Sequence, residues 1–255
     1  MICPKCKSEL VLVNNTYKCN NNHSYDVSKS GYVNLLLSKT NSGDNNDLVK
    51  ARVQFLNNGY YQELGLKINE IINSIGTNNK VLDCGCGVGY YDTFIKKQYL
   101  YLMDISKYAI IQASKINKDK EIIVASNSNI PYQDNYFDIA LYIFSPIFIN
   151  ETKRVLNNNG IIINITPGAN HLFELKELLY KDPYLNKNTI ITIDNCNMET
   201  INLKYQKVIP NDDLHNLINM TPYAYKTNKE DIDNLKIDKI NVTFDFLITI
   251  YKPIN

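Results

Sequence analysis

Four residues near the amino terminus have the types and spacing of a metal site. The pattern is Cys-x2-Cys, twelve residues, then Cys-x3-His, and its members are Cys3, Cys6, Cys19 and His23. Zinc prefers four sulfur and nitrogen ligands in a tetrahedron, which paired ligands on two tight turns can supply. Because four protein ligands leave no open coordination position, we expect a structural zinc ion that shapes a small surface and does no chemistry.

A second pattern is a glycine-rich loop that follows a short apolar run. It reads Asp-x-Gly-x-Gly-x-Gly and consists of Asp83, Gly85, Gly87 and Gly89. Glycines let a backbone turn tightly and approach a ligand closely. The next apolar run ends in Asp104, 21 positions after Asp83. A carboxylate at that place can accept hydrogen bonds from both hydroxyls of a ribose.

The loop differs from the nicotinamide fingerprint Gly-x-Gly-x-x-Gly, because Tyr90 stands where the third glycine would fall when counting from Gly85. S-adenosylmethionine (SAM) has no pyrophosphate and needs no phosphate cradle. The loop therefore resembles the first motif of class I methyltransferases and predicts a SAM site. Asn127 follows the third apolar run and is expected near the adenine. The alternative is a glycine-rich turn in an unrelated α/β protein.

The elements that must position these residues alternate along most of the chain. Apolar spacing predicts helices over 47–57 and 62–75, ended by Gly59 and Gly76. Continuous apolar runs typical of a buried parallel sheet cover 80–84, 100–103, 121–125, 137–144 and 160–165. A helix is expected over 171–180 and an antiparallel strand over 242–251. Residues 184–240 are polar and give only a mixed pattern of strands and helices.

These patterns predict an α/β protein with a class I SAM-dependent methyltransferase fold. We expect a Rossmann-like, mostly parallel seven-stranded sheet and a small N-terminal zinc-binding module. The expected divisions are the zinc-binding module (1–37), a helical linker region (38–76) and the methyltransferase domain (77–255). Within the module, short strands over 9–13 and 16–18 should flank a turn at Asn14-Asn15, and a loop should follow at Asn41–Asp44.

Composition limits the class of protein. Hydrophobic residues make up 44% of the 255, enough for a sizeable core. The net charge of +1 lacks a strong basic excess, so any RNA site must be a local patch. We find neither an 18-residue apolar run nor a signal peptide, and expect no membrane span. Six cysteines without a secretion signal predict the cytoplasm and no disulfides.

The chain resembles the RlmA family, bacterial 23S rRNA guanine-N1 methyltransferases, over nearly its whole length. Besides the two patterns above, the likeness rests on Asp26-x-x-Lys29-x-Gly31-Tyr32-Val33-Asn34-Leu35-Leu36, Gly43-Asp44, Ala51-Arg52, Phe55-Leu56, Gly59-Tyr60-Tyr61-Gln62, Gly89-Tyr90-Tyr91, Asp104-Ile105-Ser106-Lys107, Thr166-Pro167-Gly168-x-x-His171-Leu172 and Met220-Thr221-Pro222-Tyr223-Ala224. One departure is Val88, where the family often carries glutamate.

The resemblance implies methylation of N1 of a guanine in a 23S rRNA hairpin, a zinc module that helps to bind that RNA, and a homodimer. It also implies a cofactor site that includes Tyr61, Gly87, Val88 and His171 besides Asp104. The target base must be unpaired, because N1 lies on the Watson–Crick face. Stacking of that base on an aromatic ring is expected, and the candidates are Tyr90, Phe144 and Phe148.

Two other functions are compatible with the residues. One is a small-molecule SAM methyltransferase with a structural zinc, which would show no salt-sensitive RNA binding. The other is a SAM-binding, RNA-associated protein without activity. We assign no catalytic residue. A carboxylate or a backbone carbonyl could take the proton from N1, but Asp138 begins a strand and so lies at the wrong end for the site.

Overall fold

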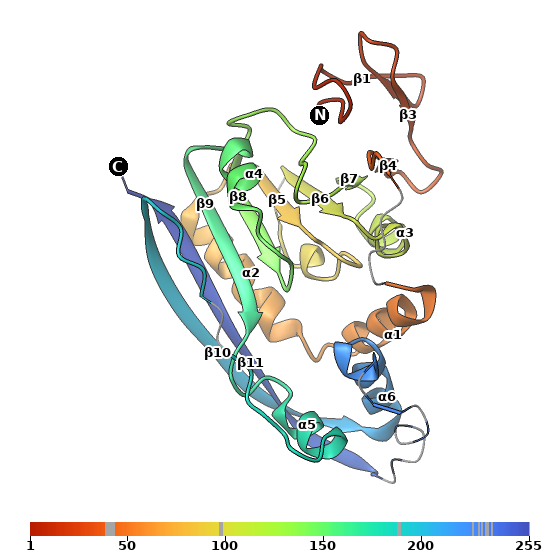
Figure 1. Ribbon diagram of the computed structural model, residues 1–255, viewed down its shortest axis with the longest axis vertical. Coiled ribbons are helices and arrows are strands. Elements are labelled where there is room, and N and C mark those ends of the chain that lie inside the picture. The colour runs from red at the N-terminus through yellow and green to blue at the C-terminus, as the bar shows by residue number, and fades with distance from the viewer. Residues whose placement is uncertain are drawn as a thin grey trace.

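The computed structural model describes residues 1–38, 44–96, 99–187, 190–225, 227, 228, 230, 232, 235 and 237–254. The loop expected at Asn41–Asp44, with Gly43 of the family likeness, lies outside these residues except for Asp44. Figure 1 shows the N-terminal module with β1, β3 and β4 at one end of the molecule, and two long strands, β10 and β11, along the opposite edge of the sheet. None of the described helices is long and apolar enough to cross a membrane.

The N-terminal module contains a small antiparallel sheet in the order β1-β2-β3. Its strands are β1 (Val11–Val13), β2 (Thr16–Lys18) and β3 (Ser24–Asp26). Asn14 and Asn15 both take a positive φ, 47° and 65°, in the two-residue turn between β1 and β2. Asparagine tolerates this conformation, and such a turn matches the twist of paired strands. The strands predicted around Asn14-Asn15 are confirmed.

The central sheet has eight strands among the described residues, in the order β10-β11-β9-β8-β5-β6-β7-β4. They are β4 (Val33–Asn34), β5 (Val81–Cys84), β6 (Leu100–Asp104), β7 (Glu121–Val124), β8 (Phe137–Ile143), β9 (Leu156–Pro167), β10 (Cys196–Pro210) and β11 (Lys239–Pro253). Neighbours from β4 to β9 are parallel, and β11 is antiparallel to β9 and β10. The predicted seven-stranded sheet is present, and β4 extends one edge.

Helices connect the strands. They are α1 (Asn46–Asn57), α2 (Gln62–Ile75), η1 (Tyr91–Thr93), α3 (Lys107–Ile116), α4 (Ile149–Val155), α5 (Phe173–Leu179), α6 (Asn211–Asn219) and η2 (Pro222–Tyr225). The Asn45 side chain caps α1 by accepting the Leu48 N–H at 2.8 Å. The helix predicted from His171 begins instead at Phe173, because Leu172 has a left-handed φ of 54°, which an α-helix cannot contain.

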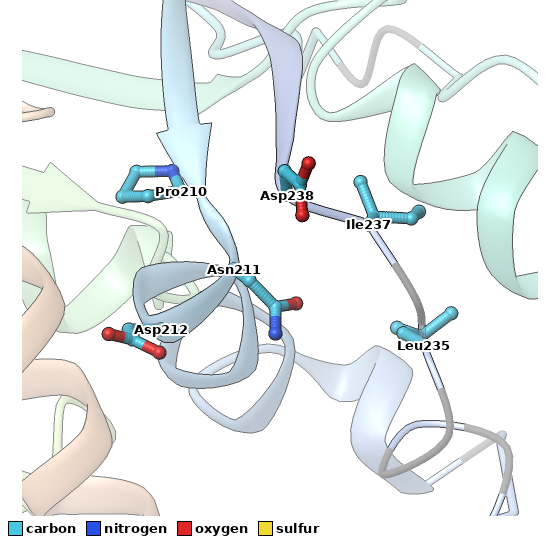
Figure 2. Close-up of a pocket in the computed structure, with 6 residues that line it drawn as sticks. All are labelled: Pro210, Asn211, Asp212, Leu235, Ile237 and Asp238. Atoms are coloured by element: carbon cyan, nitrogen blue, oxygen red, sulfur yellow. The ribbon is translucent and has the colours of Figure 1, made fainter.

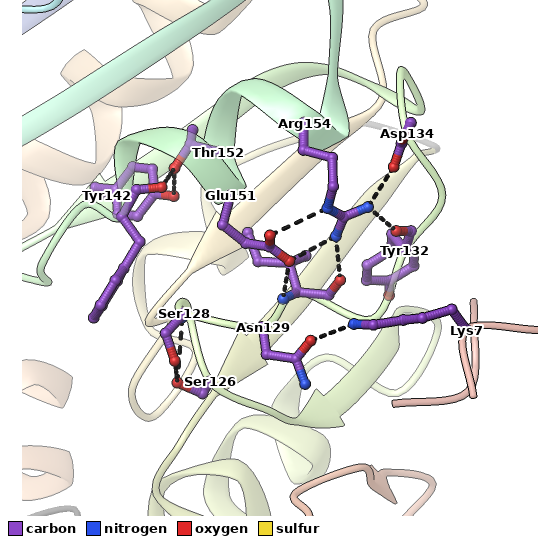
Figure 3. A network of polar contacts seen from close by, with 12 residues as sticks. Lys7, Ser126, Ser128, Asn129, Tyr132, Asp134, Tyr142, Glu151, Thr152 and Arg154 are labelled. Carbon is purple, nitrogen blue, oxygen red and sulfur yellow. Dashed lines mark hydrogen bonds and ion pairs between the residues drawn. The ribbon is translucent and has the colours of Figure 1, made fainter. Parts of the chain in front are cut away.

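The N-terminal module is packed against the segment that joins β7 to β8. The Ile2 N–H donates to the Pro131 carbonyl at 2.9 Å, and the Lys7 ammonium donates to the Asn129 side chain, as Figure 3 shows. One buried apolar cluster includes members of both parts, among them Cys3, Leu10, Cys19, Ile130 and Tyr132. The module is therefore joined to the large sheet in two ways. It shares buried core packing with the sheet, and its strand β4 is part of the sheet.

Arg154 on α4 holds the same segment in place (Figure 3). Its guanidinium donates to the carbonyls of Ile130 and Tyr132 at 2.7 and 2.8 Å. It also forms ion pairs with Glu151 and Asp134, each at 2.7 Å. Arginine offers five donors in a rigid fork, so one side chain can satisfy several acceptors at once. The segment between β7 and β8 is thus tied both to the module and to α4.

Candidate functional site

The predicted zinc ligands converge in the N-terminal module. The three sulfur atoms and the imidazole nitrogen of Cys3, Cys6, Cys19 and His23 lie within 4.8 Å of one another. The Cys3 Sγ to His23 Nδ1 distance is 3.4 Å, and the Cys6 and Cys19 sulfurs are 3.6 Å apart. A tetrahedral zinc with Zn–S bonds of about 2.3 Å separates its ligand atoms by roughly these distances. The four residues therefore fit a closed zinc site.

Polar groups lie beside two of the cysteine ligands. The hydroxyl of Ser8 lies 3.1 Å from Cys6 Sγ, and the hydroxyl of Tyr25 lies 3.3 Å from Cys3 Sγ. Hydrogen bonds from the side chain and the backbone of Ser8 lower the pKa of Cys6 to about 5. Groups that surround the ligands in this way orient them and tune their basicity.

The glycine loop follows β5 and adopts conformations that require glycine. Gly85, Gly87 and Gly89 have φ angles of +101°, +56° and +76°. A Cβ on Gly85 would lie 2.6 Å from the Cβ of Ser145, whereas a Cβ on Gly87 would meet no atom within 4 Å. The loop is therefore packed tightly at its start and open at its centre, where a ligand can approach the backbone.

Asp104 ends β6 beside the centre of the loop. Its Oδ2 accepts the Gly87 N–H at 2.8 Å, and its Oδ1 accepts the Ser106 N–H at 2.7 Å. These two bonds fix the plane of the carboxylate, and each oxygen keeps acceptor capacity. Val88, one residue further along the loop, is only 4% exposed and offers a ligand no polar side-chain atom.

Asp83 contacts a second buried acid, Asp92 on η1, that the sequence analysis did not assign to the site. Both residues are at most 2% exposed. None of their four carboxyl oxygens has a hydrogen-bond partner among the described residues. Two carboxyl groups can bond to each other only if one of them carries a proton. Burial, followed by the charge of Asp92, raises the pKa of Asp83 well above its usual range. Burial raises the pKa of Asp92 to about 7.

This acid pair predicts a specific pH dependence of stability. Asp92 of the folded protein keeps its proton up to about pH 7 and Asp83 keeps its own to a higher pH, whereas the unfolded chain releases both above about pH 4. The free energy of unfolding should therefore fall as the pH rises from about 4 to about 7, with a contribution from Asp92 of about 4 kcal/mol at 1.36 kcal/mol per pKa unit. Asp92→Asn should reduce this slope without abolishing it, because it removes one of the two titrating carboxyl groups and leaves Asp83 buried. Urea unfolding at a series of pH values measures the slope.

The matched control is Asp182→Asn, which changes an exposed carboxylate. It should keep the wild-type slope. If Asp92→Asn kept the full wild-type slope, Asp92 would not hold a proton in the folded protein over this pH range.

Tyr61 and His171, which are 110 positions apart, meet in a buried aromatic cluster. The Tyr61 hydroxyl lies 3.3 Å from His171 Nε2, and His171 Nδ1 accepts the Asp245 N–H at 3.2 Å. Burial lowers the pKa of His171 to about 3, so the ring is neutral at pH 7. Because Nδ1 is an acceptor, the proton sits on Nε2 and is donated to Tyr61. The hydroxyl proton of Tyr61 is then available to a ligand.

The segment after β8 lies directly over the loop. Asn127 donates to the carbonyls of Cys84 and Pro146 at 3.3 and 3.2 Å. The Ser145 hydroxyl also donates to the Cys84 carbonyl. Asn127 therefore joins the ends of β5 and β8 rather than presenting a free amide. Reasoning about strand ends, which selected Asn127, would also have found Ser145, whereas no sequence pattern signals Asp92.

The structure brings the predicted cofactor residues together at the carboxyl ends of the parallel strands. Parallel strands all end on the same side of the sheet, and ligands of open α/β sheets bind there. Asp138 lies elsewhere, as expected. Its carboxylate accepts the Lys80 N–H at 2.7 Å and a hydrogen bond from Asn157, at the start of β8. A hollow of about 490 Å³ beside Asp138 contains no predicted cofactor residue.

Another hollow, of about 400 Å³, lies where β10 passes into α6. Figure 2 shows its lining, which consists of Pro210, Asn211, Asp212, Leu235, Ile237 and Asp238. None of these residues belongs to the predicted zinc or cofactor site. The chemistry of the glycine loop and of the cysteine cluster therefore defines the candidate site better than cavity size does.

Comparisons with known proteins agree with this arrangement. Residues 1–40 match the family model for the N-terminal zinc ribbon of RlmA, and residues 82–164 match a model of the methyltransferase domain. YcgJ of Bacillus subtilis has a solved structure that superposes with a TM-score of 0.51 at 14% identity, and the match covers 76% of this chain and 99% of that chain. This structural likeness concerns the fold alone.

Two relatives are similar in sequence. The chain is 31% identical to YxjB of Bacillus subtilis (strain 168) over 96% of its length and 95% of that protein, to which 23S rRNA (guanine-N(1)-)-methyltransferase activity is assigned by inference. It is also 31% identical to the 23S rRNA (guanine(748)-N(1))-methyltransferase of Streptomyces fradiae, over 69% of this chain and 66% of that protein.

The fold, the glycine loop and the cysteine cluster together define a class I SAM-dependent methyltransferase with an N-terminal zinc ribbon. The predicted fold class and the predicted SAM and zinc are confirmed. Within that class the chain belongs to the RlmA family, because its likeness to YxjB extends over nearly the whole of both proteins.

Proposed function

We propose that this protein transfers the methyl group of SAM to N1 of a guanine in a hairpin loop of 23S rRNA. The observation that carries the proposal is the likeness to YxjB over 96% of the chain. The residues proposed to hold SAM are Tyr61, Asp83, Gly85, Gly87, Val88, Gly89, Asp104, Asn127 and His171. Those proposed to hold zinc are Cys3, Cys6, Cys19 and His23. The divisions 1–37, 38–76 and 77–255 are part of the same proposal.

When bound, SAM supplies an electrophilic methyl group. The chain contributes mainly orientation, because holding the two reactants in line makes the displacement effectively unimolecular. The open centre of the loop at Gly87 lets the backbone approach the ligand, and Asp104 accepts the ribose hydroxyls in the plane that its two N–H donors fix. Tyr61, to which neutral His171 donates, retains its own hydroxyl proton as a donor.

The zinc ribbon is proposed to assist recognition of the rRNA hairpin, and the protein is proposed to act as a cytoplasmic homodimer. The ribbon is packed against the segment that joins β7 to β8, and this segment begins beside Asn127 near the glycine loop, which supports a shared RNA surface. Sedimentation of the purified protein tests the dimer, and fractionation of cells that express it tests the location.

Primer extension on 23S rRNA from cells with and without this gene tests the reaction. A methyl group on guanine N1 blocks base pairing, so reverse transcriptase should stop one base before the target. The stop should vanish on deletion and return with the wild-type gene. It should not return with the Asp104→Ala variant, which lacks the proposed ribose acceptor.

A pattern of stops that is the same with and without the gene would contradict the proposal. Purified protein with labelled SAM then separates the two alternatives. Turnover with small acceptors and no salt-sensitive RNA binding would identify a small-molecule methyltransferase. Binding of SAM and RNA without any transfer would identify an inactive RNA-associated protein.

A further inference from the structure

Phe144 combines exposure with an uncommon backbone conformation. It follows β8 directly, and 43% of its surface is exposed. Its φ is +55°, in the left-handed region that a bulky residue rarely adopts. Such residues persist only where the surroundings hold them, and they cluster at ligand sites. Neighbouring contacts must therefore hold the backbone of Phe144 in this conformation, and its ring is a candidate for contact with a ligand.

The structural cause is the attachment of residues 144–146 to their neighbours. The Phe144 N–H donates to the Ile165 carbonyl at 3.0 Å. The next two residues are bound to the loop through Ser145 and Asn127, as described above. The absence of a side chain on Gly85 lets the Ser145 side chain lie directly against the loop. The segment cannot relax its φ without losing these contacts.

One part of the Phe144 ring is packed and the rest is open. Its centroid lies 6.5 Å from that of Tyr61, 5.9 Å from Phe246 and 6.2 Å from His171, whose plane is inclined by only 24°. Those three partners are buried. They support the ring from the inside of the cluster, and Phe144 itself directly follows β8, at the carboxyl end of the parallel strands.

The strand order indicates which ligand part this ring meets. In the strand order β8-β5-β6, the glycine loop that follows β5 lies between the carboxyl ends of β8 and β6. Asp104 ends β6, so the ribose is expected on that side of the loop. Phe144 directly follows β8 and lies on the other side, where the methyl acceptor must approach. An exposed aromatic face is a suitable platform for an unpaired base, because every base has a π face.

We propose that Phe144 is the stacking platform for the base that receives the methyl group, held in place by its strained backbone and by the aromatic cluster beneath it. This inference rests on the proposed function. Phe148, which has the same 43% exposure, precedes α4 and has no ring contact with that cluster among the described residues. Tyr90 packs against Tyr91 and Phe94, each with centroids 5.3 Å away.

The test measures kcat/KM for unmodified 23S rRNA and, separately, the Kd for SAM by calorimetry. Phe144→Ala should lower kcat/KM for RNA about 5- to 150-fold, the effect of losing one base–aromatic stack, and leave the Kd for SAM unchanged. Phe144→Tyr should retain activity because the ring remains. Tyr108→Ala, which removes an aromatic ring of 52% exposure on α3, is the matched control and should keep wild-type values for both quantities.

Two further variants keep the inference falsifiable. Phe144→Gly removes the ring and also relieves the positive φ, so it should melt no lower than Phe144→Ala and still lose activity. Wild-type kcat/KM for Phe144→Ala, or a larger loss for Phe148→Ala, would overturn the role of Phe144 while leaving the proposed function intact. If the wild-type protein itself left the rRNA unmethylated, the proposed function would fail first.

Discussion

Gly87→Ala is expected to weaken SAM binding at least about tenfold while the protein stays folded, a change of about 1.4 kcal/mol or more in binding free energy. A Cβ at this position meets no protein atom within 4 Å. The open space lies beside the Asp104 carboxylate that accepts the Gly87 N–H. An added methyl group would therefore enter the volume expected for the cofactor rather than disturb the packing. Calorimetric titration with SAM measures the effect.

Gly31→Ala is the matched control. Gly31 also has a positive φ, +92°, and a Cβ added there would meet no atom within 4 Å, but it lies in the zinc-binding module. Both variants should lose about 1–2 kcal/mol of stability, because an alanine is strained in the left-handed region. Only Gly87→Ala should lose affinity for SAM. Equal SAM binding by both variants and the wild type would show that the cofactor does not occupy the space beside Gly87.

The parallel strands were predictable because each is buried on both faces. β5, β6, β7 and β8 are continuous apolar runs, and each matches its expected range at one end and differs from it by one residue at the other. The zinc and glycine patterns were predictable for a different reason. Their chemistry depends on ligand type and short spacing, both of which are local properties of the sequence. The assembly of those patterns into one site follows from the shared edge of the parallel sheet.

Other features depend on contacts between distant residues. β9 begins at Leu156 rather than at Gly160, through a polar stretch, Asn157–Asn159, that carries no apolar signal. β10 is a 15-residue strand whose mostly exposed and half-buried residues gave only a mixed pattern, and pairing with β11 along its whole length stabilises it. The meeting of Asp83 with Asp92 depends on how η1 folds back over β5. Local propensity contains no information about such pairings.

Cys19→Ser is expected to release most of the bound zinc and to destabilise the N-terminal module. Structural zinc contributes about 10–16 kcal/mol of apparent folding free energy in isolated zinc-finger peptides. The effect should extend beyond the metal, because Cys3 and Cys19 share a buried cluster with Ile130 and Tyr132. We expect a lower melting temperature and a loss of rRNA methylation of at least about tenfold, or 1.36 kcal/mol. Metal analysis, calorimetry and the primer-extension assay measure these changes.

SAM binding should respond far less than methylation to the loss of zinc. The segment between β7 and β8 keeps its bonds to Arg154 and Glu151 when the module is disturbed, so the donor site should keep its Kd for SAM within about threefold, or about 0.7 kcal/mol. Cys196→Ser, which changes a half-buried thiol on β10, is the control and should retain zinc and activity. Full zinc content in Cys19→Ser would disprove the ligand set. Full rRNA methylation without zinc would show that the module, although joined to the sheet through β4, takes no part in recognising the RNA.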